Sequence, residues 1–406
     1  MKVRLKVFDP TLFWLGLAAS AVGLLVIFDA GFARSLSSGH GTIPREFLIQ
    51  LGLLPVALAI SMAVAGASWE GWRRWSILLW LATLLLLGLV MVPGIGFQMN
   101  GAHRWIKLGP LLFQPAEFAK VTALLYLAGA LAGRKTWPSR IRPARGLADW
   151  LDRVAMPKLL RGLPAVWILL GAALIALEPD LGTAFIILVA GIAIMIAGRV
   201  TWKSLVALFL IGVIGVAGLI KQQPYRMDRI VHHAQRWNDE NMDDVGFQSV
   251  QSELAMASGG LTGVGIGAGR AKQIMPAITS DFANVTPAEE FGLVGELILL
   301  GLLAAITFRL LRFARAAQQP FARLILIGVG SWIGVQTCMN VMMANGTLPS
   351  VGIPYPFVSS GGSSLIALWA ALGLCQACVA PSPRKEEARV PGRDRWRHRR
   401  ARLSSA

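Results

Sequence analysis

The sequence predicts an all-α polytopic membrane protein with about ten transmembrane helices and one large extracytoplasmic loop between helices seven and eight. Hydrophobic residues make up 55% of the 406 residues and charged residues only 15%, and the mean hydropathy is +0.58. A soluble globular domain carries about 25% charged residues. Apolar runs of about 20 residues, the length that crosses a bilayer as a helix, recur along the chain. This pattern excludes a soluble fold.

Ten segments are apolar and long enough, or nearly so, to cross a membrane as helices. The fifth and sixth are separated only by the short turn 178–182, in which a proline and a glycine break the helix. The predicted spans are 11–30, 47–67, 76–96, 114–133, 163–179, 182–198, 204–220, 289–311, 322–345 and 363–380.

The distribution of lysine and arginine predicts the orientation. These residues concentrate in the loops on one side and in the C-terminal tail, which the positive-inside rule assigns to the cytoplasm. Both termini are therefore predicted to be cytoplasmic, and the net charge of +17 marks topology and not a nucleic-acid site. We expect a transmembrane domain over 1–380 and a basic cytoplasmic tail over 381–406. The tail is predicted to be attracted to anionic lipid, with a specific partner-binding role as the alternative.

The most informative stretch is Lys221–Gly292, which is polar within an otherwise apolar chain and is predicted to be extracytoplasmic, with the loop proper at 221–288. A long polar loop of this kind is a candidate functional site. Glu289 and Glu290 close it, and we favour a structural role for both. Glu296 lies seven residues after Glu289, so the two are expected on one face of the eighth helix.

A second polar group is predicted at the outer ends of the third and fourth helices. Arg104 and Lys107 lie in the outer loop 97–113. Glu117 and Lys120 are three residues apart at the start of the fourth helix, so they share a face and are expected to pair. The functional interpretation is a cationic cradle for an anionic ligand. The alternative is an interfacial ion pair whose charged ends reach the headgroups.

The loop 346–362 is too rich in proline and glycine to form a spanning helix. Irregular backbone at membrane depth is tolerated where protein covers it or where it lines a cavity. Backbone N–H groups and hydroxyls from Ser359 to Ser364 are candidates for binding phosphate oxygens. A plain outer loop is the alternative. The sequence contains no P-loop and no metal-ligand cluster. Cys375 and Cys378 form a C-x-x-C pair, but no second ligand pair lies nearby, so we interpret them as buried side chains and not as a metal or redox site.

Several separated motifs carry a family resemblance. They are Arg104-Trp105-Ile106, Pro179-Asp180-Leu181-Gly182-Thr183, Pro224-Tyr225-Arg226 with Arg229, Gln248 with Gln251-Ser252, Ser258-Gly259-Gly260, Asp281-Phe282, Glu289-Glu290-Phe291-Gly292 and Gly361-Gly362-Ser363-Ser364. Over residues 10–380 the chain resembles the SEDS (shape, elongation, division and sporulation) proteins, the RodA/FtsW type of bacterial cell-wall polymerase. The resemblance places it in the bacterial inner (cytoplasmic) membrane, with the active site on the extracytoplasmic side.

The resemblance also implies an activity and a partner. Members of the family polymerise lipid II, a disaccharide-pentapeptide on undecaprenyl pyrophosphate, into glycan strands for division or cell shape. They work with a class B penicillin-binding protein, the transpeptidase that crosslinks the strands. The essential aspartate of the family falls on Asp281. Thr279 and Ser280 stand where the family has histidine and threonine, and activity is still expected because the aspartate is kept.

This chemistry assigns a role to each candidate residue. Asp281 is the expected general base for the acceptor hydroxyl, and direct displacement inverts the anomeric centre. Fixed cations are expected to stabilise the pyrophosphate leaving group. A divalent cation, Mg²⁺ or Mn²⁺, is an optional helper. The expected substrate-binding residues are Arg104, Lys107, Glu117, Lys120, Asp180, Arg226, Arg229, Gln248, Lys272, Ser359 and Ser363.

Two other functions use the same ligand. A lipid II flippase needs intramembrane charges and a cavity but no chemistry, and a scaffold only recruits the crosslinking partner. A carboxylate at Asp281 is expected for a polymerase and is unnecessary for a scaffold. A flippase should carry polar motifs on both membrane faces, and the cytoplasmic segments show no comparable cluster.

Overall fold

The protein is a bundle of ten long or apolar helices in a computed structural model that describes residues 8–37, 41–99, 102–109, 111–132, 164–222, 233–242 and 246–379. Within the described residues, seven helices are long and apolar enough to cross a membrane, and three further apolar helices have shorter qualifying stretches. These helices are α1 (Pro10–Ser37), α2 (Arg45–Gly66), α3 (Trp69–Val90), α4 (Pro115–Ala132), α7 (Pro164–Leu177), α8 (Leu181–Ala197), α9 (Trp202–Gln222), α15 (Gly292–Ala316), α16 (Pro320–Ala344) and α17 (Gly362–Val379). The predicted multi-pass helical membrane fold is confirmed.

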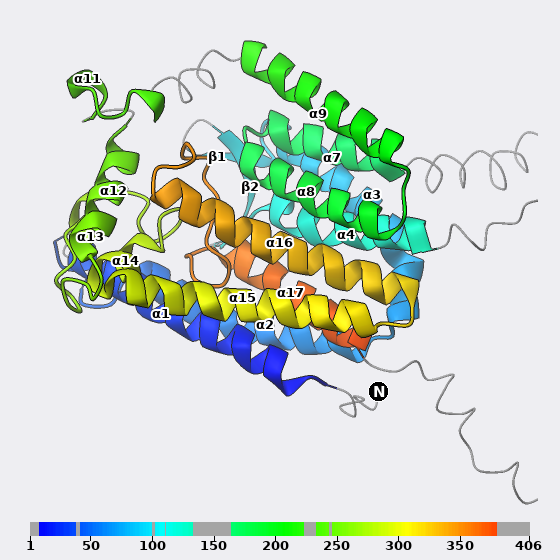
Figure 1. The fold of residues 1–406 in the computed structure, drawn as a ribbon, viewed down its shortest axis with the longest axis horizontal. Coiled ribbons are helices and arrows are strands. Elements are labelled where there is room, and N and C mark those ends of the chain that lie inside the picture. Colours follow the sequence, from blue (N-terminus) through cyan, green and yellow to red (C-terminus); the bar gives the residue numbers. More distant parts are fainter. Residues whose placement is uncertain are drawn as a thin grey trace, which may run out of the picture.

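The helices differ in how deeply they lie in the bundle. α4, α16 and α17 are buried on most of their surface, and α16 packs against α4, α8 and α15. α9 lies along the edge of the bundle (Figure 1). Its apolar side chains are largely exposed, for example Phe209 at 61% and Ile214 at 70%. Because these exposed side chains are apolar, this face of α9 suits lipid and not water.

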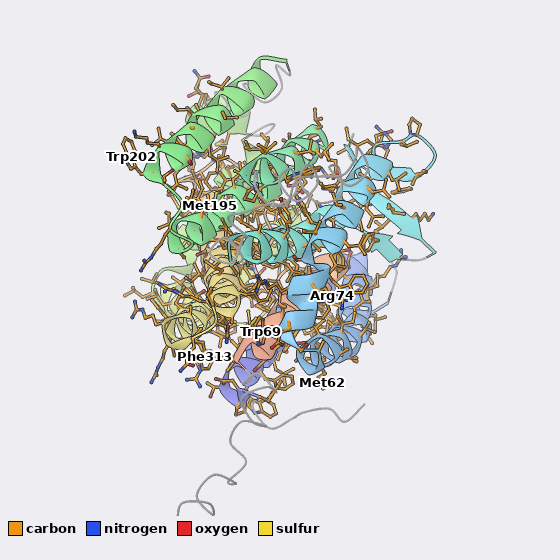
Figure 2. The ribbon with its side chains drawn as sticks, turned by 90° about the vertical axis from the view of Figure 1, so that its right-hand side faces the viewer. Met62, Trp69, Arg74, Met195, Trp202 and Phe313 are labelled. Carbon is orange, nitrogen blue, oxygen red and sulfur yellow. The ribbon has the colours of Figure 1, made fainter. Side chains whose placement is uncertain are left out.

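The two ends of the bundle are different. Between α9 and α15 the structure describes four short helices, which gather at the left end in Figure 1: α11 (Asp239–Met242), α12 (Phe247–Gly259), α13 (Ala271–Ile274) and α14 (Val285–Glu290). Figure 2 shows the opposite end, where the α2–α3 and α8–α9 connections and the end of α15 lie together, labelled at Met62, Trp69, Arg74, Met195, Trp202 and Phe313. The described loops among those predicted to be cytoplasmic thus share one end. Which membrane side that end faces stays a prediction.

The loop 97–113, which is predicted to lie outside the membrane, contains a small antiparallel sheet that the sequence did not predict. Its strands are β1 (Gly96–Met99), β2 (Ala102–Leu108) and β3 (Leu111–Phe113), in the order β1-β2-β3. Phe97 pairs with Trp105 and Ile106 with Phe113. The expectation of a purely helical fold therefore needs this amendment. β3 has only three residues, and the seven residues of β2 do not alternate strictly between apolar and polar, so the pattern that indicates a strand is missing.

The start of the eighth transmembrane helix was predicted too early. Glu289 and Glu290 end α14, and α15 begins only at Gly292. Gly292 has a φ of 66°, and a Cβ atom there would lie 2.5 Å from the backbone nitrogen of Gly263. Only glycine accepts this left-handed turn and close approach without strain. The expectation that Glu289 and Glu296 share a face of one helix is consequently wrong.

Candidate functional site

Many of the predicted site residues meet around the loop 346–362, which connects α16 to α17. Its Ile353 side chain fills the space where Gly182 has no Cβ atom. The Gln50 amide in α2 donates to the carbonyl of Ser359 at 3.3 Å and accepts from the Gly361 N–H at 3.3 Å. The loop is therefore enclosed by protein, as expected for irregular backbone between membrane helices.

Three hydrogen bonds hold the segment that carries Asp281 against this loop and α16. The Ser360 N–H donates to the carbonyl of Thr279 at 2.7 Å. The Ser359 hydroxyl donates to the carbonyl of Ser280, and the Asn340 side-chain amide donates to the carbonyl of Asp281 at 2.7 Å. Three successive carbonyls are thus fixed from outside the segment, and the backbone of Asp281 has a defined position.

Packing on the other side completes this anchoring. Phe282 is 1% exposed and belongs to a cluster with Met275, Ile278 and Val285, which packs on Ala30 of α1 and Ala344 of α16. The side chain of Asp281 itself is only half-buried. Gly352 lies beside it, since a Cβ atom there would be 3.5 Å from Asp281 Oδ2. The result is a rigidly held peptide that presents a partly accessible carboxylate.

Several of the predicted phosphate-binding groups of the loop already have partners within the protein. The N–H groups of Ser359, Ser360 and Gly361 all donate within the protein, so they are not free to bind phosphate. Ser359 is 5% exposed, and its hydroxyl also accepts from the Tyr355 N–H at 2.7 Å. The Ser363 hydroxyl accepts from the Gln114 N–H at 3.0 Å. In this state both serines hold loops together, and a direct contact with substrate stays a prediction.

The expected Glu117–Lys120 pair is present in α4. Lys120 Nζ lies 2.9 Å from both carboxylate oxygens of Glu117, and the two side chains are 1% and 3% exposed. The ammonium also donates to Gln336 Oε1 at 3.3 Å and lies 5.1 Å from the centroid of the Trp332 ring. A pair this deeply buried does not reach the headgroups, so the alternative of an interfacial ion pair is excluded. Lys120 is closed off by its partner, so it is not a free cation in this arrangement.

Arg104 in β2 makes two hydrogen bonds to the turn between α7 and α8. Its Nε donates to the carbonyl of Glu178 at 2.8 Å, and a terminal nitrogen donates to the carbonyl of Pro179. Asp180 caps α8 by accepting from the Thr183 N–H at 3.0 Å, and it accepts from the Gln114 amide at 3.2 Å. The sheet, this turn and the start of α4 therefore form one polar cluster.

Glu178 is the unusual member of the cluster. It is 1% exposed, and both of its carboxyl oxygens are buried without a hydrogen-bond partner among the described residues. Burial raises the pKa of Glu178 to about 9, with a further rise from Asp180, while the guanidinium of Arg104 opposes it. Burial likewise raises the pKa of Asp180, against Arg104 and the bond from Thr183. Glu178 is therefore protonated and neutral at pH 7.

Glu178→Gln is expected to stabilise the protein increasingly as the pH rises. Because the folded pKa of about 9 exceeds the ordinary 4.5, the folded state binds this proton more tightly. The stabilisation that Glu178 gives the folded state is complete below about pH 4.5. It is lost as the pH rises towards 9, at up to ~1.4 kcal/mol per pH unit. The gap in unfolding temperature between Glu178→Gln and the wild type is measured in detergent at pH 6 and at pH 9. The exposed Asp239→Asn serves as the control. A gap that does not change with pH would contradict this assignment.

Lys272, Glu289 and Glu290 form a separate network that fixes the loop before Asp281. Lys272 Nζ lies 2.7 Å from Asp29 Oδ1 in α1 and 2.6 Å from Glu290 Oε1. Burial lowers the pKa of Lys272, but the bonds to both carboxylates outweigh it, so the pKa is raised. Glu289 and Glu290 accept from four backbone N–H groups between Gly267 and Ala271. The preferred structural role of both glutamates fits this geometry, whereas Lys272 is not an open cation here.

The other predicted residues are placed less tightly. Lys107 is exposed, with Nζ 5.5 Å from the centroid of the Phe97 ring, and Gln248 lies half-buried at the start of α12. Arg226, Arg229 and the tail 381–406 lie outside the described residues. Sequence reasoning missed Gln336 and Asn340 of α16. Two amides four residues apart in an apolar segment were the available signal.

Comparison with known proteins identifies the family. The model of the FtsW/RodA/SpoVE cell cycle proteins matches residues 10–380. The chain belongs to the FtsW/RodA/SpoVE family. A probable peptidoglycan glycosyltransferase FtsW of Allochromatium vinosum is 34% identical, covering 88% of this chain and 86% of the relative. Stage V sporulation protein E of Bacillus subtilis is 31% identical, covering 87% and 92%.

Two solved structures share the fold of this FtsW/RodA/SpoVE protein. Rod shape determining protein RodA of Thermus thermophilus matches with a TM-score of 0.62 at 30% identity, covering 92% of this chain and 97% of that one. A chain from a study of "structural coordination of polymerization and crosslinking by a peptidoglycan synthase complex" matches with a TM-score of 0.70 at 30% identity, covering 92% and 98%. The protein is thus a multi-pass membrane member of a family of cell-wall glycosyltransferases.

Proposed function

We propose that the protein polymerises lipid II into glycan strands by inverting glycosyl transfer, with Asp281 as the general base. The observation that carries the proposal is the half-buried Asp281 carboxylate on a segment whose three carbonyls are held by Asn340, Ser359 and Ser360. A fixed carboxylate of this kind suits proton abstraction, because a general base must keep its place relative to the proton it removes. Relatives named as peptidoglycan glycosyltransferases support the same activity.

The reaction follows from this placement. The acceptor 4-hydroxyl oxygen attacks the anomeric carbon of the donor sugar, and its proton passes to the Asp281 carboxylate. The bond between the anomeric carbon and the pyrophosphate oxygen breaks, and undecaprenyl pyrophosphate leaves with the electron pair. Attack opposite the leaving group inverts the centre, so an α-linked donor yields a β-linkage.

The leaving group gains negative charge, which fixed cations stabilise in the transition state. Among the predicted cations that the structure describes, Lys120 and Lys272 are closed in ion pairs. Arg104 is the better candidate, because its guanidinium donates to the neutral carbonyls of Glu178 and Pro179, whereas the two lysines donate to carboxylates. The described residues contain no group of three Asp, Glu, His or Cys side chains placed to hold a metal. Assistance by a divalent cation, Mg²⁺ or Mn²⁺, stays a prediction.

The cellular setting belongs to the same proposal. The 1–380 domain lies in the bacterial inner membrane with both termini cytoplasmic, and the extracytoplasmic segment 221–288 carries the chemistry. The partner is a class B penicillin-binding protein that crosslinks the strands. A similar chain occurs in a structure described as a peptidoglycan synthase complex that coordinates polymerisation and crosslinking, which supports such a pairing.

The direct test is strand synthesis by the purified protein. The protein in detergent is incubated with lipid II, alone and with its crosslinking partner, and the products are separated on a gel. Glycan strands longer than the substrate are the expected result. Binding of lipid II without any strand product, in either condition, would reject the polymerase and leave a flippase or a scaffold.

Arg104→Ala is expected to lower turnover about 10- to 100-fold, because one positive charge near the leaving group is lost. Arg104→Lys keeps the charge but not the pair of hydrogen bonds to the carbonyls of Glu178 and Pro179, so it should retain more activity than the alanine variant. Lys203→Ala, an exposed cation on α9, is the matched control and should behave like the wild type. Equal activity of Arg104→Ala and Lys203→Ala would remove Arg104 from the mechanism.

A further inference from the structure

α16 carries two buried amide side chains on one face. Gln336 and Asn340 are four residues apart, and both are 0% exposed. Residues at this spacing lie one above the other on a helix. Burying an amide is costly unless its polar atoms are hydrogen-bonded. The bonds that these two side chains make run between segments that are far apart in the chain.

Gln336 connects the buried ion pair to the loop 346–362. Its Oε1 accepts from Lys120 Nζ at 3.3 Å and from Trp332 Nε1 at 2.6 Å. Its Nε2 donates to the carbonyl of Pro354 at 2.8 Å. One planar amide therefore sets the distance between the Glu117–Lys120 pair on α4 and the backbone of this loop.

Asn340 makes the next connection. Its Nδ2 donates to the carbonyl of Ile353 at 2.7 Å and to the carbonyl of Asp281 at 2.7 Å. The two hydrogens of one amide nitrogen point in fixed directions, so this side chain fixes the two carbonyls relative to each other. Ile353 follows Gly352, the residue beside the Asp281 carboxylate.

We infer that Gln336 and Asn340 are positioning residues, which hold the Asp281 carboxylate in register with the Glu117–Lys120 pair. This inference rests on the proposed function. A continuous path of contacts runs from Glu117 through Lys120, Gln336 and the 353–354 backbone to Asn340 and Asp281. Neither amide touches the reacting atoms in this role. Each acts through the backbone that it holds.

Asn340 is the more critical of the two because it acts on Asp281 itself. Ser359 and Ser360 hold Ser280 and Thr279, so without Asn340 the segment stays attached but its third carbonyl is released. The carboxylate is then free to leave its working position, while the groups that bind lipid II are unchanged. A shift of about 1 Å in a reacting group lowers the rate about 100-fold.

Asn340→Leu, which has similar bulk and no donor, tests this. We expect kcat for strand synthesis to fall about 10- to 100-fold, with KM for lipid II within about threefold. The matched control is Gln376→Leu. Gln376 is also a buried amide with two backbone hydrogen bonds, one from the N–H of Asp9 and one to its carbonyl, at 2.9 Å each. It lies near the C-terminal end of α17, whereas the loop 346–362 joins the N-terminal end. Gln376→Leu should lose thermal stability while kcat per folded molecule stays unchanged.

A second readout follows the Asp281 segment directly. Hydrogen exchange of peptides covering residues 276–284 should become faster in Asn340→Leu and not in Gln376→Leu. Where Asn340→Leu does not fold, Asn340→Gln is measured, which keeps the amide but displaces it by one methylene. Wild-type kcat and wild-type exchange in the folded Asn340 variant would overturn the inference.

Failure of the inference is distinguishable from failure of the proposed function. Suppose that the wild type is active, Asp281→Asn is inactive and the Asn340 variant is fully active. This result rejects the positioning role of Asn340 and leaves the proposed function standing. A wild type that makes no strands from lipid II rejects the proposed function. In that case the exchange of residues 276–284 still decides whether Asn340 holds the segment.

Discussion

Asp281→Asn is expected to abolish glycan-strand synthesis while leaving the protein folded. Asparagine has nearly the same shape as aspartate, so the Asn340, Ser359 and Ser360 bonds to the backbone of this segment should persist. The side chain can no longer accept a proton at neutral pH. A general base contributes about 10²- to 10⁴-fold to the rate, and a loss of this size brings strand synthesis below detection on a gel.

The measurement compares strand yield at equal concentrations of folded protein. Asp239→Asn is the control, since Asp239 is an exposed carboxylate in the same segment between α9 and α15 and its loss should change nothing. Lipid II binding by Asp281→Asn should remain near that of the wild type. Near-normal strand synthesis by Asp281→Asn would exclude Asp281 as the base.

Lys120→Met is expected to cause the largest loss of stability. It leaves the Glu117 carboxylate, 3% exposed, without its ammonium partner. Breaking a buried ion pair by removing one partner costs about 3–5 kcal/mol, because an uncompensated charge stays in a medium that solvates it poorly. The bond to Gln336 is lost as well. We therefore expect a lower unfolding temperature and a strong loss of turnover.

The double variant Glu117→Gln/Lys120→Met separates stability from function. With no charge left in the site, its unfolding temperature should recover towards the wild type, since neutral groups replace a buried ion pair at little cost. Its turnover should stay low if the pair takes part in binding or positioning. Thermal unfolding and strand yield are measured on the same samples, with Lys203→Ala as control. If Lys120→Met alone were as stable as the wild type, the expected cost of breaking the buried ion pair would be contradicted.

The sequence determined the features that depend on local spacing. Runs of apolar residues predicted all ten helices to within a few residues in most cases, because the length of a spanning helix follows from the bilayer thickness. The three-residue spacing of Glu117 and Lys120 predicted their ion pair, since such residues share a helix face. The family resemblance singled out Asp281, whose role as the base stays a prediction.

The tertiary structure decided which distant segments meet. The Lys272 ion pair with Asp29 joins residues 243 positions apart, and the bond from Ser359 to Ser280 joins residues 79 positions apart. No local pattern encodes such pairs, because they form only when helices from different parts of the chain pack together. The break at Gly292 depends in the same way on the close approach of Gly263. Asn340 was visible in the sequence as a polar residue in an apolar helix, but its bond to the Asp281 carbonyl exists only because the fold brings the two segments within 2.7 Å.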